Sequence, residues 1–363
     1  MKKYLLLSDC SATQICGVKR KQEELNQNIK ENGDDCLLIN SDEFTTFRPP
    51  YWKDVKIMLP TVYSYYKLSK MIEDYDPDCI CILTEGTIGL CASIHCKLMG
   101  RKYSTMRCTR IEEYFNYKIS KYVINHFLTC FHSFSHCCIS PSVKLSKTYE
   151  HKNSVGILNG CNTDSFSIEG NKDKTLENYE KPLWLYVGRL TSEKNVLEIC
   201  NVSKKLPGTF IIVGDGPMKQ KLIGENIKTL GWKQNEELSS IYRSCDMFIF
   251  PSKTDTFGQV MVEAMASGLP VSAYDCYGPN EVVKNGITGF IEDDLLVSCN
   301  KTYDLFCEKG DIKTKCVEHA KTFSWKKMTQ EFINVQTTAE KKYNLYMIFP
   351  IPLMLSFLWI ITC

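Results

Sequence analysis

The chain has 363 residues, of which 44% are hydrophobic and 24% are charged, and its formal net charge is +2. A chain of this length is sufficient for two domains of ordinary size, each with its own core. The near-neutral charge lacks the basic footprint of a nucleic-acid-binding protein, so nucleic acid is not an expected partner.

In the first half, short apolar segments alternate with amphipathic ones, a pattern that predicts βα units and parallel sheets. Residues 3–9 are expected to form a first strand, and Gly17 lies in a turn before a long helix that stops near Gly33. A second buried strand begins at Cys79 and enters a glycine turn that carries Glu85. The expected architecture is therefore α/β.

The 19 cysteines are scattered through segments that read as core strands and helices. Only a few apolar residues follow Lys2 and Lys3, too few for a secretory signal, so we expect reduced, buried thiols in a cytosolic compartment. A zinc site could be drawn from the cluster His132, His136, Cys137 and Cys138. The paired spacing of structural zinc sites is missing, however, so a strand is favoured there and no metal is expected.

The second half begins with an apolar strand, residues 183–187, that ends at Gly188 and is followed by Arg189 and Lys194. Open α/β sheets bind ligands at the carboxyl ends of their strands. An arginine fork and a lysine charge could neutralise a departing diphosphate there without a metal. The alternative is a pair of solvated cations.

Another strand, residues 210–213, runs into Gly214-Asp215-Gly216-Pro217. On its own this tetrapeptide indicates a tight turn more often than a binding site.

A third strand, residues 246–250, leads to Asp255, Gly258 and Glu263. Gly258 allows a ligand to approach the start of the next helix, where the N–H groups and the helix dipole favour a phosphate. Glu263 lies far enough along that helix to face the same cleft as Asp255. Alternatively, both acids only offset the dipole at a helix start.

Together these segments closely resemble the family 4 retaining glycosyltransferases, which have the GT-B fold of two Rossmann-like domains facing across a cleft. The resemblance covers nearly all of the second half and extends to Phe323-Ser324-Trp325. In that family the first acid is usually Glu, and here it is Asp255, as in members similar to lipid-glycosylating and mannosyl-type enzymes.

The resemblance implies a role for each residue of the pattern. Arg189 and Lys194 would contact the diphosphate, Glu263 the ribose, and Asp255 with the Phe257 and Gly258 amides the sugar and phosphate. The remaining implied positions are Gly17, Gly188, Gly214 and Gly216 on the donor side, and Glu85 and Glu113 on the acceptor side. No cofactor is implied.

Cys108 departs from the family pattern. It stands in Met106-Arg107-Cys108-Thr109-Arg110, where relatives have a histidine beside the donor sugar that assists transfer. A thiol cannot supply the paired hydrogen-bonding sites of imidazole. Either the sugar is held differently, or activity is weak or absent.

The expected domain order follows from composition. The stretch from Ile157 to Pro182 shifts to polar residues and contains the best linker candidate. We predict an acceptor-side domain over 1–165, a linker over 166–182, a donor-binding domain over 183–325, a helix over 326–344 that packs back on the first domain, and a hydrophobic tail over 345–363.

The tail carries no charge, is just long enough to cross a bilayer, and follows Lys341 and Lys342. Pro350 and Pro352 would shorten its helical part, and packing into a core groove is the alternative. The tail suggests attachment to the cytosolic face of a membrane.

The expected function is transfer of a hexose, with retention, from a UDP-, GDP- or ADP-sugar to a hydroxyl of a membrane lipid or glycan. Two alternatives stay open, namely a nucleotide-sugar epimerase or hydrolase on the same fold and a non-catalytic sugar-nucleotide-binding membrane protein. Asp76-Pro77-Asp78 reads as a turn and not as a manganese site, and no Gly-x-Gly-x-x-Gly opens a first helix as in nicotinamide dehydrogenases.

Overall fold

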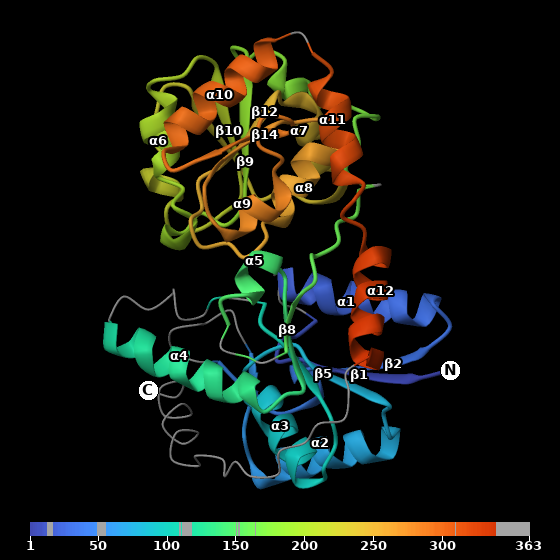
Figure 1. The fold of residues 1–363 in the computed structure, drawn as a ribbon. Helices are drawn as coiled ribbons and strands as arrows, with labels where there is room; N and C mark the ends of the chain where they lie inside the picture. Colours follow the sequence, from blue (N-terminus) through green and yellow to red (C-terminus); the bar gives the residue numbers. More distant parts are fainter. Residues whose placement is uncertain are drawn as a thin grey trace. The chain divides into compact units, whose positions relative to one another are not determined.

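The computed structural model describes residues 1–12, 17–48, 56–108, 110, 118–149, 151, 153–163, 165–308 and 310–338. Its contacts divide the chain into two units (Figure 1). The first contains residues 1–158 and those from Trp325 onward, and the second contains Asn159–Ser324. Each unit is built on its own parallel sheet.

The sheet of the first unit has six strands, all parallel, in the order β2-β1-β5-β6-β7-β8. A separate antiparallel pair joins β3 to β4. The strands are β1 (Lys3–Leu7), β2 (Asp35–Ile39), β3 (Thr46–Phe47), β4 (Ile57–Met58), β5 (Cys79–Ile82), β6 (Ser104–Met106), β7 (Cys137–Ser140) and β8 (Ser154–Gly156).

Helices pack against both faces of this sheet, and strand β1 is accordingly buried on both sides. Those of this unit are α1 (Gly17–Glu31), the 3₁₀ turn η1 (Ser41–Glu43), α2 (Val62–Tyr75), α3 (Thr87–Leu98), α4 (Lys118–Ser133), α5 (Val143–Ser146) and α12 (Trp325–Thr338).

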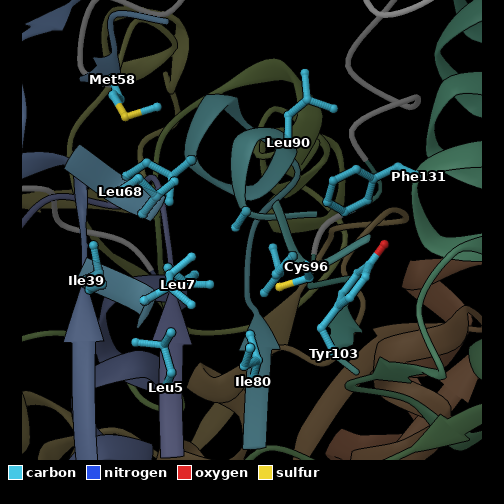
Figure 2. Packing of buried hydrophobic residues seen from close by; sticks show 14 of the residues in the cluster. Leu5, Leu7, Ile39, Met58, Leu68, Ile80, Leu90, Cys96, Tyr103 and Phe131 are labelled. Carbon is cyan, nitrogen blue, oxygen red and sulfur yellow. The ribbon is translucent and has the colours of Figure 1, made fainter. Parts of the chain in front are cut away.

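Strand β1 supplies both cores of the unit because successive side chains point to opposite faces. Leu5 and Leu7 face a core built with α2, α3 and α4, and Figure 2 shows them beside Ile39 of β2 and Ile80 of β5. Leu6 faces a second core, where α1 and α12 lie side by side (Figure 1). The helix α12, near the end of the chain, therefore packs on the helix that follows the first strand.

The second unit has another six-stranded parallel sheet, in the order β11-β10-β9-β12-β13-β14. Its strands are β9 (Leu183–Val187), β10 (Thr209–Val213), β11 (Ile227–Gly231), β12 (Met247–Phe250), β13 (Val271–Tyr274) and β14 (Gly289–Glu292). The strands expected at residues 183–187, 210–213 and 246–250 are thus confirmed to within one residue.

Helices lie on both faces of this sheet as well. On one face Trp184 of β9 stacks on Phe210 of β10, with ring centres 5.7 Å apart, in a core that also contains residues of α6 and α10. The helical elements are η3 (Lys174–Leu176), η4 (Ser192–Lys194), α6 (Glu198–Ser203), η5 (Lys219–Lys221), α7 (Asn235–Ser244), α8 (Gln259–Ala266), α9 (Tyr277–Val282), α10 (Leu295–Cys307) and α11 (Ile312–Ala320).

The polar segment 166–182 lies within the second unit, although its composition suggests a linker. Phe166 and Leu176 are buried, and the Phe166 ring meets Tyr242 edge-on at 5.3 Å. Polar composition is a weak guide here because two apolar side chains are enough to anchor the segment.

Two further expectations concern thiols and the tail. The cysteines of the described residues are thiols, and most of them are buried. Glu113 and the hydrophobic tail 345–363 lie outside the described residues. Among the helices that are described, none has both the length and the apolar character needed to cross a bilayer.

Candidate active site

The strand order of the second unit reverses direction between β9 and β12, because the chain moves outward from β9 to β10 and β11 and then returns to β12. Open α/β sheets bind ligands at such a switch point, outside the carboxyl ends of the strands. Lys194 lies in the segment after β9, and Asp255 lies in the segment after β12. The topology thus places both predicted residues at the expected binding edge.

Lys194 and Asp255 form an ion pair there. The Lys194 ammonium donates to Oδ1 of Asp255 over 2.6 Å, and the two side chains are 21% and 19% exposed. The second carboxylate oxygen, Oδ2, is buried and accepts no hydrogen bond from the part of the chain that the structure describes. A buried carboxylate oxygen without a donor costs free energy, so this atom is suited to accept a hydrogen bond from a ligand.

Two hydrogen bonds hold the segments after β9 and β12 together. The amide of Asn195 donates to the Pro251 carbonyl over 3.2 Å, and the Thr254 hydroxyl donates to the Glu193 carbonyl over 3.4 Å. Asn195 has a left-handed backbone, with φ of 52°, which Asn tolerates better than most residues. These contacts position Lys194 against Asp255.

The helix α8 begins directly beside this pair. Gly258 precedes it with φ of 82°, a conformation that favours glycine, and so confirms the expected glycine-opened helix. The Gly278 N–H donates to the Asp255 carbonyl over 3.1 Å, while the Phe257 ring is buried against Phe323. The start of α8 is therefore fixed from several sides, as an anion site at a helix N-terminus requires.

Glu263, further along α8, is only 5% exposed. Its Oε2 accepts a hydrogen bond of 3.2 Å from the hydroxyl of Tyr242, on α7. Tyr242 also stacks on Phe248 of β12, with ring centres 6.0 Å apart. Glu263 thus has an internal partner that the sequence pattern did not reveal, and a ribose contact would have to share the carboxylate with that partner.

Arg189 is the most exposed of the predicted cations. Its side chain is 61% exposed and lies 3.3 Å from Oε1 of Glu193. Burial, reinforced by the charges of Asp255 and Glu193, raises the pKa of the nearby Tyr186, whose neutral hydroxyl donates to the Arg189 carbonyl over 3.0 Å. The Arg189 backbone is therefore fixed while its guanidinium reaches solvent.

The glycines predicted on the donor side, Gly188, Gly214 and Gly216, lie in the turns after β9 and β10. A Cβ at Gly214 would lie 1.9 Å from the Gly188 carbonyl oxygen, and φ at Gly214 is 140°. Close approach of two backbone segments explains glycine at this position, whether or not a ligand also binds there.

We expect Gly214→Ala to destabilise the second unit by about 1–3 kcal/mol, because the methyl group overlaps backbone atoms that cannot move independently. Hydrogen exchange of peptides from β9 and β10 should accelerate. Gly17→Ala is the matched control, since a Cβ at Gly17 would meet nothing within 4 Å. Equal exchange in the two variants would contradict the packing explanation.

The remaining predicted residues belong to the first unit. Gly17 is the first residue of α1, and Glu113 is outside the described residues. Glu85 is buried, and its carboxylate lies 3.3 Å from Nε2 of His132. Cys108 lies beside the buried Lys21, with 3.6 Å between Sγ and Nζ. The sequence pattern did not indicate that His132 would contact Glu85 or that Lys21 would contact Cys108.

The second unit contains the part of the chain that matches a known protein family. Residues 167–299 match the family model of the glycosyl transferases group 1. The sulfoquinovosyl transferase SQD2 of Arabidopsis thaliana is 35% identical over 44% of this chain and 34% of its own length. A GDP-mannose-dependent alpha-mannosyltransferase of Corynebacterium glutamicum is 37% identical over 30% of this chain and 27% of its own. The matches thus span about a third of these relatives.

Solved structures resemble nearly the whole fold. Anabaena HepE in complex with UDP superposes with a TM-score of 0.68 at 15% identity, covering 92% of this chain and 99% of HepE. A glycosyltransferase from Rickettsia africae superposes with a TM-score of 0.69 at 19% sequence identity, covering 94% of this chain and 100% of its own. At these identities the likeness concerns the fold, and it confirms the expected GT-B class. The similarity to the glycosyl transferases group 1 thus lies in residues 167–299, within the second unit.

Proposed function

We propose that this protein is a retaining glycosyltransferase that moves a hexose from a nucleotide diphosphate sugar to an acceptor hydroxyl. The observation that carries the proposal is the Lys194–Asp255 pair at the switch point of the second sheet, with Oδ2 of Asp255 buried and open to a donor. A sugar hydroxyl is a suitable donor for that oxygen.

The relatives support the class of donor. Some are named as GDP-mannose-dependent transferases, and HepE was solved with UDP and with UDP-glucose. Because these proteins use different bases, we propose a nucleotide diphosphate sugar as the class and leave UDP-, GDP- and ADP-sugars as the candidates for measurement.

In the proposed mechanism the chain mainly positions groups and stabilises charge. The start of α8 and the exposed Arg189 guanidinium would receive the diphosphate, since N–H groups and a cation both favour developing negative charge. Asp255 would hold a sugar hydroxyl through Oδ2, and Lys194 would keep Asp255 in place. The acceptor hydroxyl would attack on the face that the diphosphate leaves.

For the acceptor we propose a membrane lipid or glycan, and for the location the cytosolic face of a membrane. The support is the uncharged stretch 345–363, preceded by Lys341 and Lys342. A membrane attachment would raise the local concentration of a lipid acceptor without changing intrinsic affinity.

The test is nucleotide release by the full chain in detergent from UDP-, GDP- and ADP-sugars, with and without membrane lipid extract. Release that needs one donor and the extract would support the proposal, and NMR of the product would report the anomeric configuration. Release without any acceptor would favour a hydrolase or epimerase. Donor binding with no release under any condition would favour the non-catalytic alternative, with Cys108 marking a lost activity.

A further inference from the structure

A buried lysine in the first unit has an unusual set of neighbours. Lys21 of α1 is 3% exposed, and its ammonium lies 3.5 Å from Sδ of Met106 and 3.6 Å from Sγ of Cys108. A buried ammonium requires a strong acceptor or a counter-charge, and a thioether is only a weak acceptor. Of the two sulfurs, only the thiol can become an anion.

The position of Cys108 suits that role. Cys108 is only partly buried, whereas Lys21 is buried. A thiol beside a lysine cation ionises more readily than an isolated thiol, because the cation stabilises the thiolate. Lys21 and Cys108 are 87 residues apart in sequence, so only the fold brings them together.

The thiol of Cys81, on β5, faces the same group. Burial raises its pKa, the Cys108 sulfur raises it further, and Lys21 opposes the shift without cancelling it. Cys81 therefore stays a neutral thiol, so of these two thiols Cys108 is the one that we consider as the anion beside Lys21. In two other partly exposed thiols, those of Cys91 and Cys276, burial raises the pKa to about 12.

We propose that Lys21 holds Cys108 as a thiolate and that Cys108 is a site of covalent modification by small carbon electrophiles. With an alkyl halide, the sulfur attacks the carbon, an S–C bond forms, the carbon–halogen bond breaks, and the halide leaves with the electron pair. The inference does not depend on the proposed transferase function.

The experiment alkylates the full chain with iodoacetamide at pH 6 and pH 8 and follows each cysteine peptide by mass spectrometry. An ordinary thiol reacts roughly fifty to a hundred times faster at pH 8 than at pH 6, because little thiolate exists at pH 6. We expect the ratio for Cys108 to stay below about five. Each ratio compares one cysteine with itself, so differences in accessibility cancel. N-acetylcysteine in the same buffers supplies the ordinary ratio.

Lys21→Met removes the charge while keeping the length and apolar stem of the side chain. We expect it to slow alkylation of Cys108 at pH 6 by at least about tenfold. Lys30→Met, at the exposed end of the same helix, should leave the rate unchanged. Far-UV circular dichroism confirms that both variants are folded.

Three results would overturn the proposal. They are an ordinary pH ratio for Cys108 in the unmodified sequence, no adduct on Cys108 at either pH, or an unchanged rate in a folded Lys21→Met variant. If Lys21→Met fails to fold, the pH ratio of the unmodified sequence still decides.

Discussion

Replacing Lys194 with alanine should lower kcat for sugar transfer by about 10²- to 10³-fold, the range observed when one preorganised electrostatic contact is removed from an active site. Without its ammonium, Asp255 loses the 2.6 Å contact that fixes Oδ1, and the carboxylate is left partly buried and unpaired. The rate of nucleotide release with saturating donor and acceptor measures the effect.

Lys301→Ala is the matched control for this variant. Lys301 also pairs with a carboxylate in the second unit, that of Glu292, but the pair lies on α10 and β14 and is more exposed. We expect it to leave turnover within about twofold of the starting protein, because exposed pairs contribute little. Near-normal turnover by a folded Lys194→Ala variant would contradict the proposed role.

Asp255→Asn distinguishes a catalytic pair from a merely structural one. It keeps the shape of the side chain but replaces one oxygen by a donor, so it should weaken both the contact with Lys194 and the acceptance of a sugar hydroxyl. If Lys194 and Asp255 act as a unit, the variant that combines Lys194→Ala with Asp255→Asn should turn over no more slowly than the slower of the two single variants. Additive losses would indicate that Lys194 and Asp255 act separately.

The elements that position this site were predictable because their signals are local. Apolar runs mark β9, β10 and β12, and the glycine before Gln259 marks the start of α8. Lys194 and Asp255 each follow one of these strands, so the rule for carboxyl ends of parallel strands, together with the family resemblance, indicated them.

The partners of the site residues were not predictable, because they depend on which strands and helices become neighbours. Glu263 meets Tyr242 from a different helix, 21 residues earlier in the chain. Whether β9 borders β12 is a property of the strand order and not of either strand. The same limit explains Phe166, whose polar surroundings concealed a buried contact with Tyr242.

The second large effect is expected in the first unit, at a buried pair of Glu85 and His132. Their side chains are 6% and 4% exposed, and 3.3 Å separates Oε1 of Glu85 from Nε2 of His132. Nδ1 of His132 lies 2.9 Å from the Thr105 hydroxyl, so both ring nitrogens have partners. Glu85→Gln should destabilise this unit by up to about 3 kcal/mol, because it removes one of the charge partners that stabilise the buried imidazolium.

The pH dependence gives this prediction its sign. Burial lowers the pKa of His132, but Cys138 and Glu85 together outweigh it and raise the value to about 9 from an ordinary 6.5. A raised pKa in the folded state means that the protonated form is stabilised. The contribution of protonated His132 to the stability of the folded state is complete below about pH 6.5 and is lost as the pH rises through about 9. It amounts to about 3 kcal/mol at most.

Hydrogen exchange of peptides from β6 and α4 measures the first unit separately, which matters because two units need not unfold together. Exchange in the starting protein should accelerate between pH 6.5 and 9.5 beyond the intrinsic effect of pH, and Glu85→Gln should reduce that excess. Glu73→Gln is the control, since Glu73 pairs with His95 in the same unit but is 36% exposed, so about 1 kcal/mol or less is expected. Had Glu85 only an acceptor-binding role, Glu85→Gln would change transfer and leave exchange unaltered. Transfer and exchange, measured on this one variant, therefore test the proposed acceptor role and the structural role of Glu85 separately.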